Sequence, residues 1–598
     1  MIKLSDYIIR YLEQLNVKHM FMLPGGGAMH LNDSLGKSKK IEYICCLHEQ
    51  ACAIAAEAYA RVTNNIGLLM VTTGPGGTNA LTGIAGAYIE STPVLVISGQ
   101  VKIMDQIRGQ GIRQQGMQEV DIVSVVKPIT KYAVMVNDPN SIKYHLDKAV
   151  YEAKHGRPGP VWLDIPLDVQ ATMIDQETLA SYETPDENQE EISDRVSSII
   201  DILNNCERPV LLAGNGIRLS RGIDDFHQLI NLLGIPVLTT WNGIDLIWED
   251  HPLYYGRPGG LGHRYANFIQ QNSDFFLSIG ARLNLLQTGY NFDGFARCAK
   301  KIMVDIDPNE LRKINVRPDI PVCADAALFI REIIQQKDKI IRKERRAWLD
   351  YCDRIKKAYP LITDSMRGQN EKVNTYLLLE AISEQMNPDD IFIAGSSGSC
   401  IEISMQGFKV KNGQRVFTTK GLAAMGYGLP STIGAALASG GKRTVCVNGD
   451  GGFQMNIQEL ETLRRLGFPI KIFVLDNGGY AAIKGTQTNL FGGHLVACTE
   501  DSKLTMPNII DVAKAYKLRT VAITCNDELR LKVAETLGGN DPVICVLSVS
   551  IDLQVVPKQV SYKRKDGQME SLPLEYMNPP LSEDELKSNM LIPMYQRG

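Results

Sequence analysis

Short apolar runs alternate with amphipathic stretches along most of the chain, a pattern typical of parallel sheets flanked by helices. In residues 1–174, an amphipathic stretch to about Leu15 precedes apolar runs in 19–24 and 41–47, and an alanine-rich helical pattern starts at His48. The alternation returns in residues 193–338 and 366–550. We therefore predict an α/β fold with three doubly wound parallel-sheet domains. In the second domain, strands are expected near Val210–Ala213, Pro236–Thr239, Phe275–Ile279 and Lys301–Val304.

Three segments connect or follow these domains. Residues 175–192 are acidic and poor in apolar residues, as is typical of a linker. Residues 337–360 are charged, with helix formers and few breakers, and predict a connecting helix. Residues 551–598 contain several prolines and little periodicity. This tail predicts an extended arm packed on the body or on a neighbouring copy.

Charge and apolar patterning narrow the classes of partner. The chain of 598 residues has 63 Lys and Arg against 67 Asp and Glu, a net charge of −4, so no basic excess favours nucleic acid. No apolar run reaches the roughly 18 residues of a membrane span, and the N-terminus is amphipathic rather than a signal peptide. The 12 scattered cysteines indicate a reducing, cytoplasmic location. Small molecules and copies of the chain itself are the expected partners.

A candidate metal site lies in residues 449–480. Asp450 follows the apolar run 444–447, and Asn477 follows the apolar run 470–475, with a helical pattern between them. Two parallel strands joined by a helix place both side chains at the carboxyl edge of the sheet, where ligands bind. One carboxylate and one carboxamide suit Mg²⁺. Alternatively, Asp450 caps a helix and Asn477 makes a turn.

The spacing of this pair resembles a known motif. Asp450 and Asn477 are 477 − 450 = 27 positions apart, and the stretch is similar to the GDG…NN motif of thiamine diphosphate (ThDP) enzymes. The resemblance implies that Asp450, Asn477 and the carbonyl oxygen of Gly479 hold the metal. The first Asn of the motif is Asp476 here, a departure that adds a carboxylate beside the metal. By the same resemblance, the cofactor also contacts Gly449, Gly451 and Tyr480.

A second motif lies far upstream, in PGGGAMHLNDSL (24–35) and LHEQACAIAAEAYAR (47–61). Glu49 begins the alanine-rich helical stretch, and composition alone explains it equally well by the helix dipole. With Gly26 in the preceding glycine-rich loop, it resembles the catalytic glutamate of ThDP enzymes. The resemblance implies that Glu49 shares a proton with the aminopyrimidine ring and so activates the thiazolium carbon.

Two further stretches match the family. The strand, glycine-rich loop and helix at 71–88 lack the order of a nucleotide-binding P-loop, and instead resemble the family's TxGPGxxN loop, with Thr73, Gly76 and Asn79 near the aminopyrimidine. In 420–436, Met425 stands where the family has the apolar residue that bends the cofactor, although Met is usually a gap filler in a core.

Nearly the whole chain is similar to the acetolactate synthase-like group, and most of all to its members from bacterial surface-polysaccharide clusters. The three domains are then a pyrimidine-binding domain (1–174), a central domain (193–338) and a diphosphate-binding domain (366–550), followed by the tail (551–598). Because the family builds each site between the first domain of one subunit and the third of another, the resemblance implies a homo-oligomer. It also implies that Gln118 and Lys131 lie near the active site.

The resemblance also makes FAD a candidate cofactor of the central domain. Without it, the glycines around Asn215 would be a weak dinucleotide fingerprint, because the third glycine is missing, and they are the only support for an alternative, an NAD-dependent dehydrogenase. The stretches GNGIR, TTWNG and VDIDPNE are similar to the group's flavin-contacting segments. The implied FAD-contacting residues are Gly214, Asn215, Gly216, Thr240, Asp305 and Asp307.

Two departures separate the chain from housekeeping acetolactate synthases. Leu286 stands where the family has an arginine that reaches the active site, and Thr486 replaces the acceptor-selecting tryptophan in the stretch that also contains Ile483. Both changes widen and neutralise the acceptor side of the pocket. We therefore predict decarboxylation of a 2-oxo acid, with pyruvate as first choice, and ligation of the two-carbon unit to a carbonyl acceptor such as a keto-sugar nucleotide. Acetolactate synthase, a simple lyase or decarboxylase, a C–C hydrolase and a non-catalytic ThDP-binding subunit remain alternatives.

Overall fold

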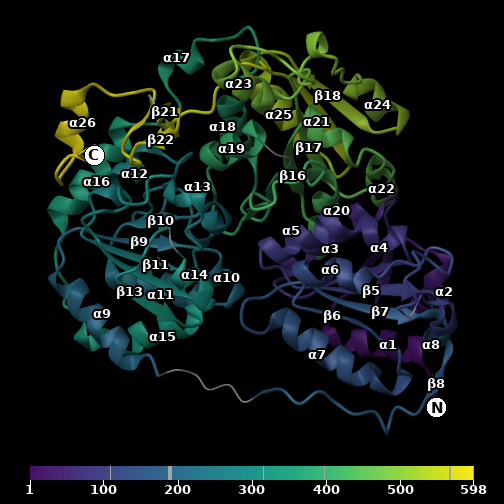
Figure 1. Cartoon of the computed structure of the whole chain (residues 1–598). Coiled ribbons are helices and arrows are strands. Elements are labelled where there is room, and N and C mark those ends of the chain that lie inside the picture. Colours follow the sequence, from purple (N-terminus) through teal and green to yellow (C-terminus); the bar gives the residue numbers. More distant parts are fainter. Residues whose placement is uncertain (108, 186–190, 314, 396–397, 565–566, 597–598) are drawn as a thin grey trace.

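The computed structural model describes residues 1–107, 109–185, 191–313, 315–395, 398–564 and 567–596. It contains three large sheets, of six, five and six strands, in which every strand pair is parallel. Figure 1 shows the three units as an N-terminal unit in purple to blue, a central unit in teal and a C-terminal unit in green. The predicted α/β fold with three parallel-sheet domains is confirmed. Among the described residues, no helix has the length and apolar character needed to cross a membrane.

The N-terminal unit has the strand order β3-β2-β4-β5-β7-β6. Helices α3 and α5 cover one face of the sheet, and α1 and α7 cover the other (Figure 1). The short strands β1 (Ile2–Lys3) and β8 (Met173–Ile174) pair antiparallel and close the unit. The strands are β2 (His19–Met22), β3 (Glu42–Cys45), β4 (Gly67–Val71), β5 (Val94–Gln100), β6 (Tyr132–Met135) and β7 (Val161–Pro166). The helices include α1 (Leu4–Leu12), α2 (Met29–Gly36), α3 (Glu49–Thr63), α4 (Pro75–Asn79), α5 (Leu81–Ile89), α6 (Ile122–Val126), α7 (Ile142–Lys154) and α8 (Leu167–Ala171).

The C-terminal unit repeats this topology. Its strand order, β15-β14-β16-β17-β19-β18, has the same arrangement of first to sixth strand as the N-terminal unit. The strands are β14 (Ile391–Ala394), β15 (Arg415–Thr418), β16 (Thr444–Gly449), β17 (Ile470–Asp476), β18 (Arg519–Ile523) and β19 (Val543–Ser548). The helices are α17 (Asp364–Arg367), α18 (Thr375–Gln385), α19 (Ser399–Gly407), α20 (Gly428–Ala438), α21 (Asp450–Gln454), α22 (Glu459–Leu466), α23 (Ala481–Leu490), α24 (Ile509–Ala515) and α25 (Leu529–Leu537).

The central unit has five strands in the order β10-β9-β11-β12-β13. Four of these strands, β9 to β12, lie within one residue of the apolar runs that predicted them, because these runs are buried and bounded by turn residues. The fifth, β13, is not among the predicted strands. The strands are β9 (Pro209–Ala213), β10 (Val237–Thr239), β11 (Phe275–Ile279), β12 (Lys300–Asp305) and β13 (Ile320–Cys323). The helices are α9 (Ser193–Asn205), α10 (Gly216–Leu219), α11 (Ile223–Leu233), α12 (Arg264–Gln271), α13 (Leu285–Thr288), α14 (Pro308–Arg312) and α15 (Ala326–Gln335).

All three sheets share a crevice of the same kind. In each, the first strand (β2, β9 or β14) has the second strand of its unit on one side and the third on the other. Ligands of open α/β sheets bind at this point, beyond the carboxyl ends of the strands. The motif residues follow the first or the third strand of a unit: Gly26 follows β2 and Gly214 follows β9, whereas Thr73 follows β4 and Asp450 follows β16.

The N-terminal and C-terminal units pack closely together through α3 and α20. Small residues along α3 allow the approach, and a Cβ on Gly434 of α20 would overlap the carbonyl oxygen of Ala55. The apolar core is continuous across this boundary, because residues such as Ala51 of α3 and Ile433 of α20 belong to one buried cluster. These two units therefore share a core rather than merely touching.

The segment 337–360 and the tail differ from their sequence predictions. The segment contains a short 3-10 turn, Lys337–Lys339, and the helix α16 (Arg346–Ala358), and α16 buries its apolar face in a core cluster of the central unit rather than spanning between units. The tail is not simply extended: it forms β20 (Lys558–Gln559), β21 (Ser561–Lys563), β22 (Met569–Ser571), β23 (Met577–Asn578) and α26 (Glu583–Asn589). Figure 1 shows it in yellow beside α12 and α16.

Candidate functional site

The Asp450 carboxylate, at the carboxyl end of β16, accepts hydrogen bonds from four backbone N–H groups. Its Oδ1 accepts from Gly451 at 2.7 Å, and its Oδ2 accepts from Asn477, Gly478 and Gly479 at 3.1, 2.8 and 3.2 Å. The Oδ1 of Asn477 also accepts from the Gly479 N–H, at 3.1 Å. The side-chain oxygens of both predicted metal ligands therefore converge on one backbone group.

These oxygens form a donor set that fits Mg²⁺. The Asp450 side chain is buried, and its burial raises the pKa of the carboxyl group to about 6, although the surrounding N–H groups oppose this. A cation would offset the cost of burying the charge. In the described part of the chain, no group of three or more His, Cys, Asp or Glu side chains is arranged to hold a metal. A cation beside Asp450 would thus depend on amide oxygens and ligand phosphates, as is typical of Mg²⁺.

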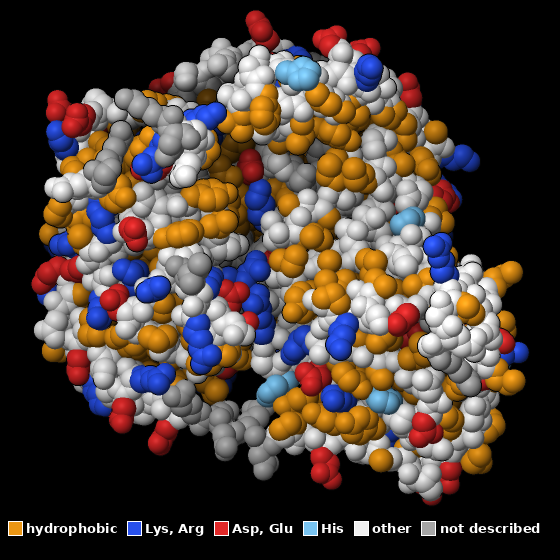
Figure 2. Space-filling view, in the orientation of Figure 1, with side chains coloured by type: hydrophobic (Ala, Val, Ile, Leu, Met, Phe, Trp, Pro, Cys, Tyr) orange, Lys and Arg blue, Asp and Glu red, His pale blue; other side chains and the backbone are white. Residues whose placement is uncertain are grey.

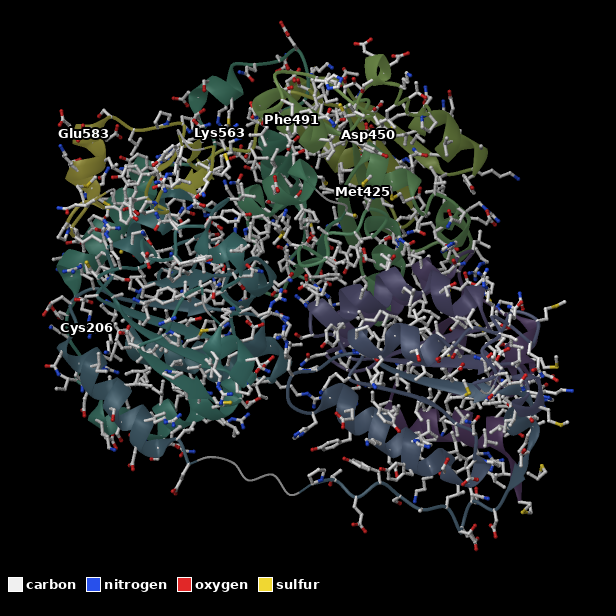
Figure 3. All side chains as sticks on the ribbon, in the orientation of Figure 1. Cys206, Met425, Asp450, Phe491, Lys563 and Glu583 are labelled. Atoms are coloured by element: carbon white, nitrogen blue, oxygen red, sulfur yellow. The ribbon has the colours of Figure 1, made fainter. Side chains whose placement is uncertain are left out.

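Met425 and Tyr480 pack against Gly451, the residue that follows Asp450. A Cβ on Gly451 would overlap the Tyr480 ring and would lie 3.2 Å from the methyl group of Met425. The three predicted cofactor contacts therefore meet at one point, and Figure 3 shows Met425 and Asp450 in the same unit, with Met425 toward the N-terminal unit. Gly449, the last residue of β16, leads the chain into this space.

In the N-terminal unit, Glu49 begins α3 and faces α4. Its Oε2 accepts a hydrogen bond from the Asn79 Nδ2 at 3.0 Å. His48 caps the helix by accepting from the Gln50 N–H at 3.0 Å, so Glu49 does not perform that task. Glu49 as a whole is 6% exposed. Asn79 and Gly76 both lie on α4, so the predicted Glu49, Gly76 and Asn79 lie on adjacent helices.

The glycine-rich loop after β2 meets the loop after β4. Gly27, next to the predicted Gly26, donates to the Thr72 Oγ1 at 3.2 Å. Thr73 is buried, and its hydroxyl group has no hydrogen-bond partner, as expected where a ligand supplies the partner. Gln118 adopts a left-handed backbone conformation, φ 66°, and its carbonyl oxygen lies directly against Gly74. The structure thus brings these predicted residues to one edge of the sheet.

The two half-sites lie on either side of the boundary between α3 and α20. The Leu47 N–H donates to the Glu459 Oε1 at 2.8 Å, and the Tyr427 hydroxyl donates to the Glu57 Oε2 at 2.8 Å. The hydrogen bonds of Glu49 stay within the N-terminal unit, and those of Asp450 stay within the C-terminal unit. The hydrogen-bond partners of each carboxylate therefore come from its own unit.

A cavity of about 1360 Å³ opens where the three units meet. Four of the six residues predicted to contact FAD line it, namely Asn215, Gly216, Thr240 and Asp305. Burial raises the pKa of Asp305. Figure 2 shows Lys and Arg side chains along the seam between the central and N-terminal units, and the cationic residues of the cavity lining are Lys154, Arg157, Arg282, Arg331 and Lys420.

The other two predicted FAD residues support the cavity from outside its lining. The Gly214 N–H donates to the Ile279 carbonyl oxygen at 2.9 Å, which joins the loops after β9 and β11. The Asp307 Oδ2 accepts from the Arg157 Nη1 at 3.1 Å, across the boundary to the N-terminal unit. Asp307 is therefore already paired.

The four predicted substrate-pocket residues lie on different elements. Leu286 lines the cavity on α13, and Lys131 donates from its Nζ to the His155 carbonyl oxygen at 2.6 Å beyond the end of α7. Ile483 and Thr486 lie on α23, a helix without a buried residue. Within one chain, these positions do not form a single pocket.

One buried carboxylate that the sequence patterns did not single out connects all three units. Glu90 follows α5, lines the cavity and accepts hydrogen bonds from Gly421 of the C-terminal unit and Asn242 of the central unit. The only sequence signal is a lone charge between the apolar helix 81–89 and the apolar strand 94–99. Its two hydrogen-bond partners lie more than 150 positions away, so the signal does not identify them.

Comparisons with known proteins match the three units in order. Three family models match: "Thiamine pyrophosphate enzyme, N-terminal TPP binding domain" over residues 2–125, the family's central domain over 196–333, and its C-terminal TPP binding domain over 396–547. The chain is 32% identical to the acetolactate synthase large subunit of Cyanidium caldarium over 558 residues, 91% of this chain and 93% of that one. It is 32% identical to that of Corynebacterium glutamicum over 567 residues, with 92% and 87% covered, and 30% identical to chloroplastic acetolactate synthase 2 of Zea mays over 572 residues, with 92% and 86% covered. The chain therefore belongs to the thiamine diphosphate-dependent enzymes related to acetolactate synthase.

Proposed function

We propose that the enzyme decarboxylates a 2-oxo acid, with pyruvate as first choice, and ligates the two-carbon unit to a bulky carbonyl acceptor, a keto-sugar nucleotide. The observation that carries the proposal is the pairing of Glu49 with Asn79 and of Asp450 with Asn477, combined with altered residues at the acceptor positions. The chain's resemblance to members of surface-polysaccharide clusters points to a sugar nucleotide.

The roles of the residues follow from their positions. Asp450, Asn477 and the Gly479 carbonyl oxygen would hold Mg²⁺ and, through it, the diphosphate of the cofactor. ThDP supplies a nucleophilic carbon and an electron sink for decarboxylation when bound. Glu49 would hold and return a proton at the aminopyrimidine, and the Asn79 amide fixes the orientation of its carboxylate by a 3.0 Å hydrogen bond.

The acceptor end of the site differs from that of acetolactate synthases in side-chain size and charge. By the family resemblance, acetolactate synthases have an arginine at the position of Leu286 and a tryptophan at the position of Thr486. Ile483 is 47% exposed on α23, so the face of this helix is free to contact an acceptor larger than a second pyruvate. We assign Gln118 to the reacting end, because its strained backbone holds it against the Gly74 loop.

FAD is the proposed ligand of the cavity between the units. Asn215, Gly216 and Thr240 follow strands at the switch point of the central sheet, and this is where nucleotides bind in doubly wound folds. Asp305 ends β12 as a buried carboxylate, suited to accept from ribose or ribityl hydroxyl groups.

We further propose a homo-oligomer in which the Glu49 half-site of one subunit faces the Asp450 half-site of another. Large apolar side chains beside both half-sites are exposed in the single chain, and an oligomer would cover them. They are Met29, Leu47, Met117 and Met455, which are 49, 51, 87 and 50% exposed.

The test is a product analysis. Purified enzyme with ThDP and MgCl₂ should release CO₂ from pyruvate and form a branched product only with a keto-sugar nucleotide. Glu49→Gln should reduce CO₂ release by at least about 10²-fold while it retains ThDP binding, and Glu42→Gln, on the exposed end of the neighbouring strand β3, should leave both unchanged. If the enzyme releases CO₂ from none of the 2-oxo acids tested, the first half of the proposal is refuted.

Acetolactate synthase is the second candidate, because the named relatives carry that activity in their names. Acetolactate as the main product from pyruvate alone would favour it over sugar ligation. An aldehyde product would favour a simple decarboxylase, and cleavage of a C–C bond by water would favour a hydrolase. If Glu49→Gln leaves every phenotype unchanged, the chain is a non-catalytic ThDP-binding subunit.

A further inference from the structure

The segment that carries Met425 is held at its start from two other units. Residues 418–425 run from the end of β15 to Met425. Glu90 accepts the Gly421 N–H at 2.6 Å and the Asn242 Nδ2 at 2.8 Å. Asn242 in turn accepts the Thr418 N–H at 3.3 Å. One carboxylate and one carboxamide thus fix two points of the same segment.

Gly421 packs tightly against Glu90. A Cβ on Gly421 would lie 2.5 Å from the Glu90 Oε1, so the backbone of the segment rests directly on the carboxylate. Glu90 is 8% exposed. Because the segment lies against the carboxylate without an intervening side chain, a shift of the carboxylate shifts the backbone that leads to Met425.

The charges at this point are balanced by Glu90. Arg61 forms a buried ion pair with Glu57 and donates to the Thr418 carbonyl oxygen at 2.8 Å. Its Nη2 lies 3.7 Å from the Glu90 Oε2, and the Arg282 Nη2 lies 4.0 Å from the same oxygen. Two cations therefore share two carboxylates, and the loss of the charge on Glu90 leaves the buried Arg61 and the half-buried Arg282 with Glu57 as their one remaining carboxylate here.

We propose that Glu90 is a positioning residue for the cofactor site, which sets the path of residues 418–425 and thereby the position of Met425. It does so from another unit, without touching the cofactor itself. The inference rests on the proposed function in one respect, namely that Met425 contacts ThDP. In Glu90→Gln, the carboxamide oxygen can still accept from one of the two donors, the Gly421 N–H or the Asn242 Nδ2. The NH₂ group of the carboxamide then faces the other donor and the two arginines.

The test uses the full-length protein and direct titration of ThDP in the presence of MgCl₂, by calorimetry. Glu90→Gln should raise the Kd for ThDP at least about tenfold, as is common for residues that support a ligand-binding group. Glu575→Gln is the matched control: Glu575 is 1% exposed and is bonded at 2.7 Å to both Arg297 and Gln271, within the central unit and tail. This control should lower the thermal midpoint and leave the Kd unchanged.

A second variant keeps the test decisive if Glu90→Gln folds poorly. Asn242→Ala removes the partner that joins Glu90 to Thr418, and it should raise the Kd by a smaller factor. Combined with Glu90→Gln, it should add less than its separate effect, because both act through one segment. If both variants bind ThDP as tightly as the wild type, the inference is wrong. If the wild type itself does not bind ThDP, the proposed function fails instead.

Discussion

Asp450→Asn should stabilise the cofactor-free protein and abolish its response to the cofactor. The amide oxygen of Asn can take the position of the Asp450 Oδ2 and keep the three N–H donors of residues 477–479, while its NH₂ group faces the Gly451 N–H, which is bonded at 2.7 Å in the wild type. One hydrogen bond is lost, at a cost of about 1–3 kcal/mol. The charge is lost as well.

The charge is the larger effect above pH 6. Burial raises the pKa of Asp450 from its ordinary 3.8 to about 6, so the unfolded chain releases this proton at lower pH than the folded protein. The free energy of unfolding of the wild type therefore falls as pH rises from about 4 to about 6, by about 3 kcal/mol in all. Asn carries no such penalty. The stability of Asp450→Asn relative to the wild type should thus increase by about 1 kcal/mol between pH 5 and pH 7.5.

Scanning calorimetry at these two pH values, with and without ThDP and MgCl₂, tests the reasoning. At pH 7.5 the cofactor-free variant should unfold a few degrees above the wild type, and a hundredfold excess of cofactor over Kd should reverse the order, since it stabilises only the wild type, by about 2.7 kcal/mol. Asp390→Asn is the control, because the Asp390 carboxylate is paired with Arg443 at 2.9 Å, and its loss should destabilise at both pH values. The same destabilisation for Asp450→Asn at both pH values would refute the account.

Three further predictions concern single sites. Gly451→Ala places a methyl group against the Tyr480 ring and should weaken ThDP binding about tenfold or more by titration, whereas Gly485→Ala, with open space around it, should not. Burial raises the pKa of Asp164 to about 7, so the free energy of unfolding falls as pH rises from about 4 to about 7. Asp164→Asn should make the thermal midpoint depend less on pH over this range, and an unchanged dependence would contradict the reasoning. Thr486→Trp restores a large ring on α23 and should shift product from bulky acceptors toward pyruvate, measured by competition between the two; an unaltered product ratio would count against the assignment.

The sequence predicts those parts of the fold that depend on local patterns. The strand expected at 470–475 is β17, Ile470–Asp476, because a buried parallel strand is a continuous apolar run bounded by turn residues. The half-sites are predictable for a related reason: Asp450 and Asn477 lie in one motif, and Glu49 and Asn79 lie in two motifs of the same sheet, separated by 30 positions. The parallel edge of the sheet brings such residues together without further information.

Long-range packing explains what the sequence does not predict. The segment 337–360 looks like a solvated connector, because its charged residues outnumber its apolar residues, but Trp348, Tyr351, Cys352 and Ile355 repeat at helical spacing on one buried face of α16. This apolar stripe indicates a buried helix face, but the many charged residues of the segment make it hard to recognise in the sequence. Glu90 offers no such signal, since its partners come from two other units and their approach depends on the completed fold.

The tail has a consequence for the order of events during synthesis. Leu574 and Leu586 belong to the same buried cluster as Phe268 and Phe276 of the central unit, and the Asn267 Nδ2 donates to the Leu574 carbonyl oxygen at 3.0 Å. A domain normally folds once its own residues have left the ribosome. The central unit cannot complete its core in this way, because the last part of that core is translated after the whole C-terminal unit. A chain truncated after residue 550 should therefore expose this apolar face of the central unit to chaperones, although it contains all the residues of the two neighbouring units.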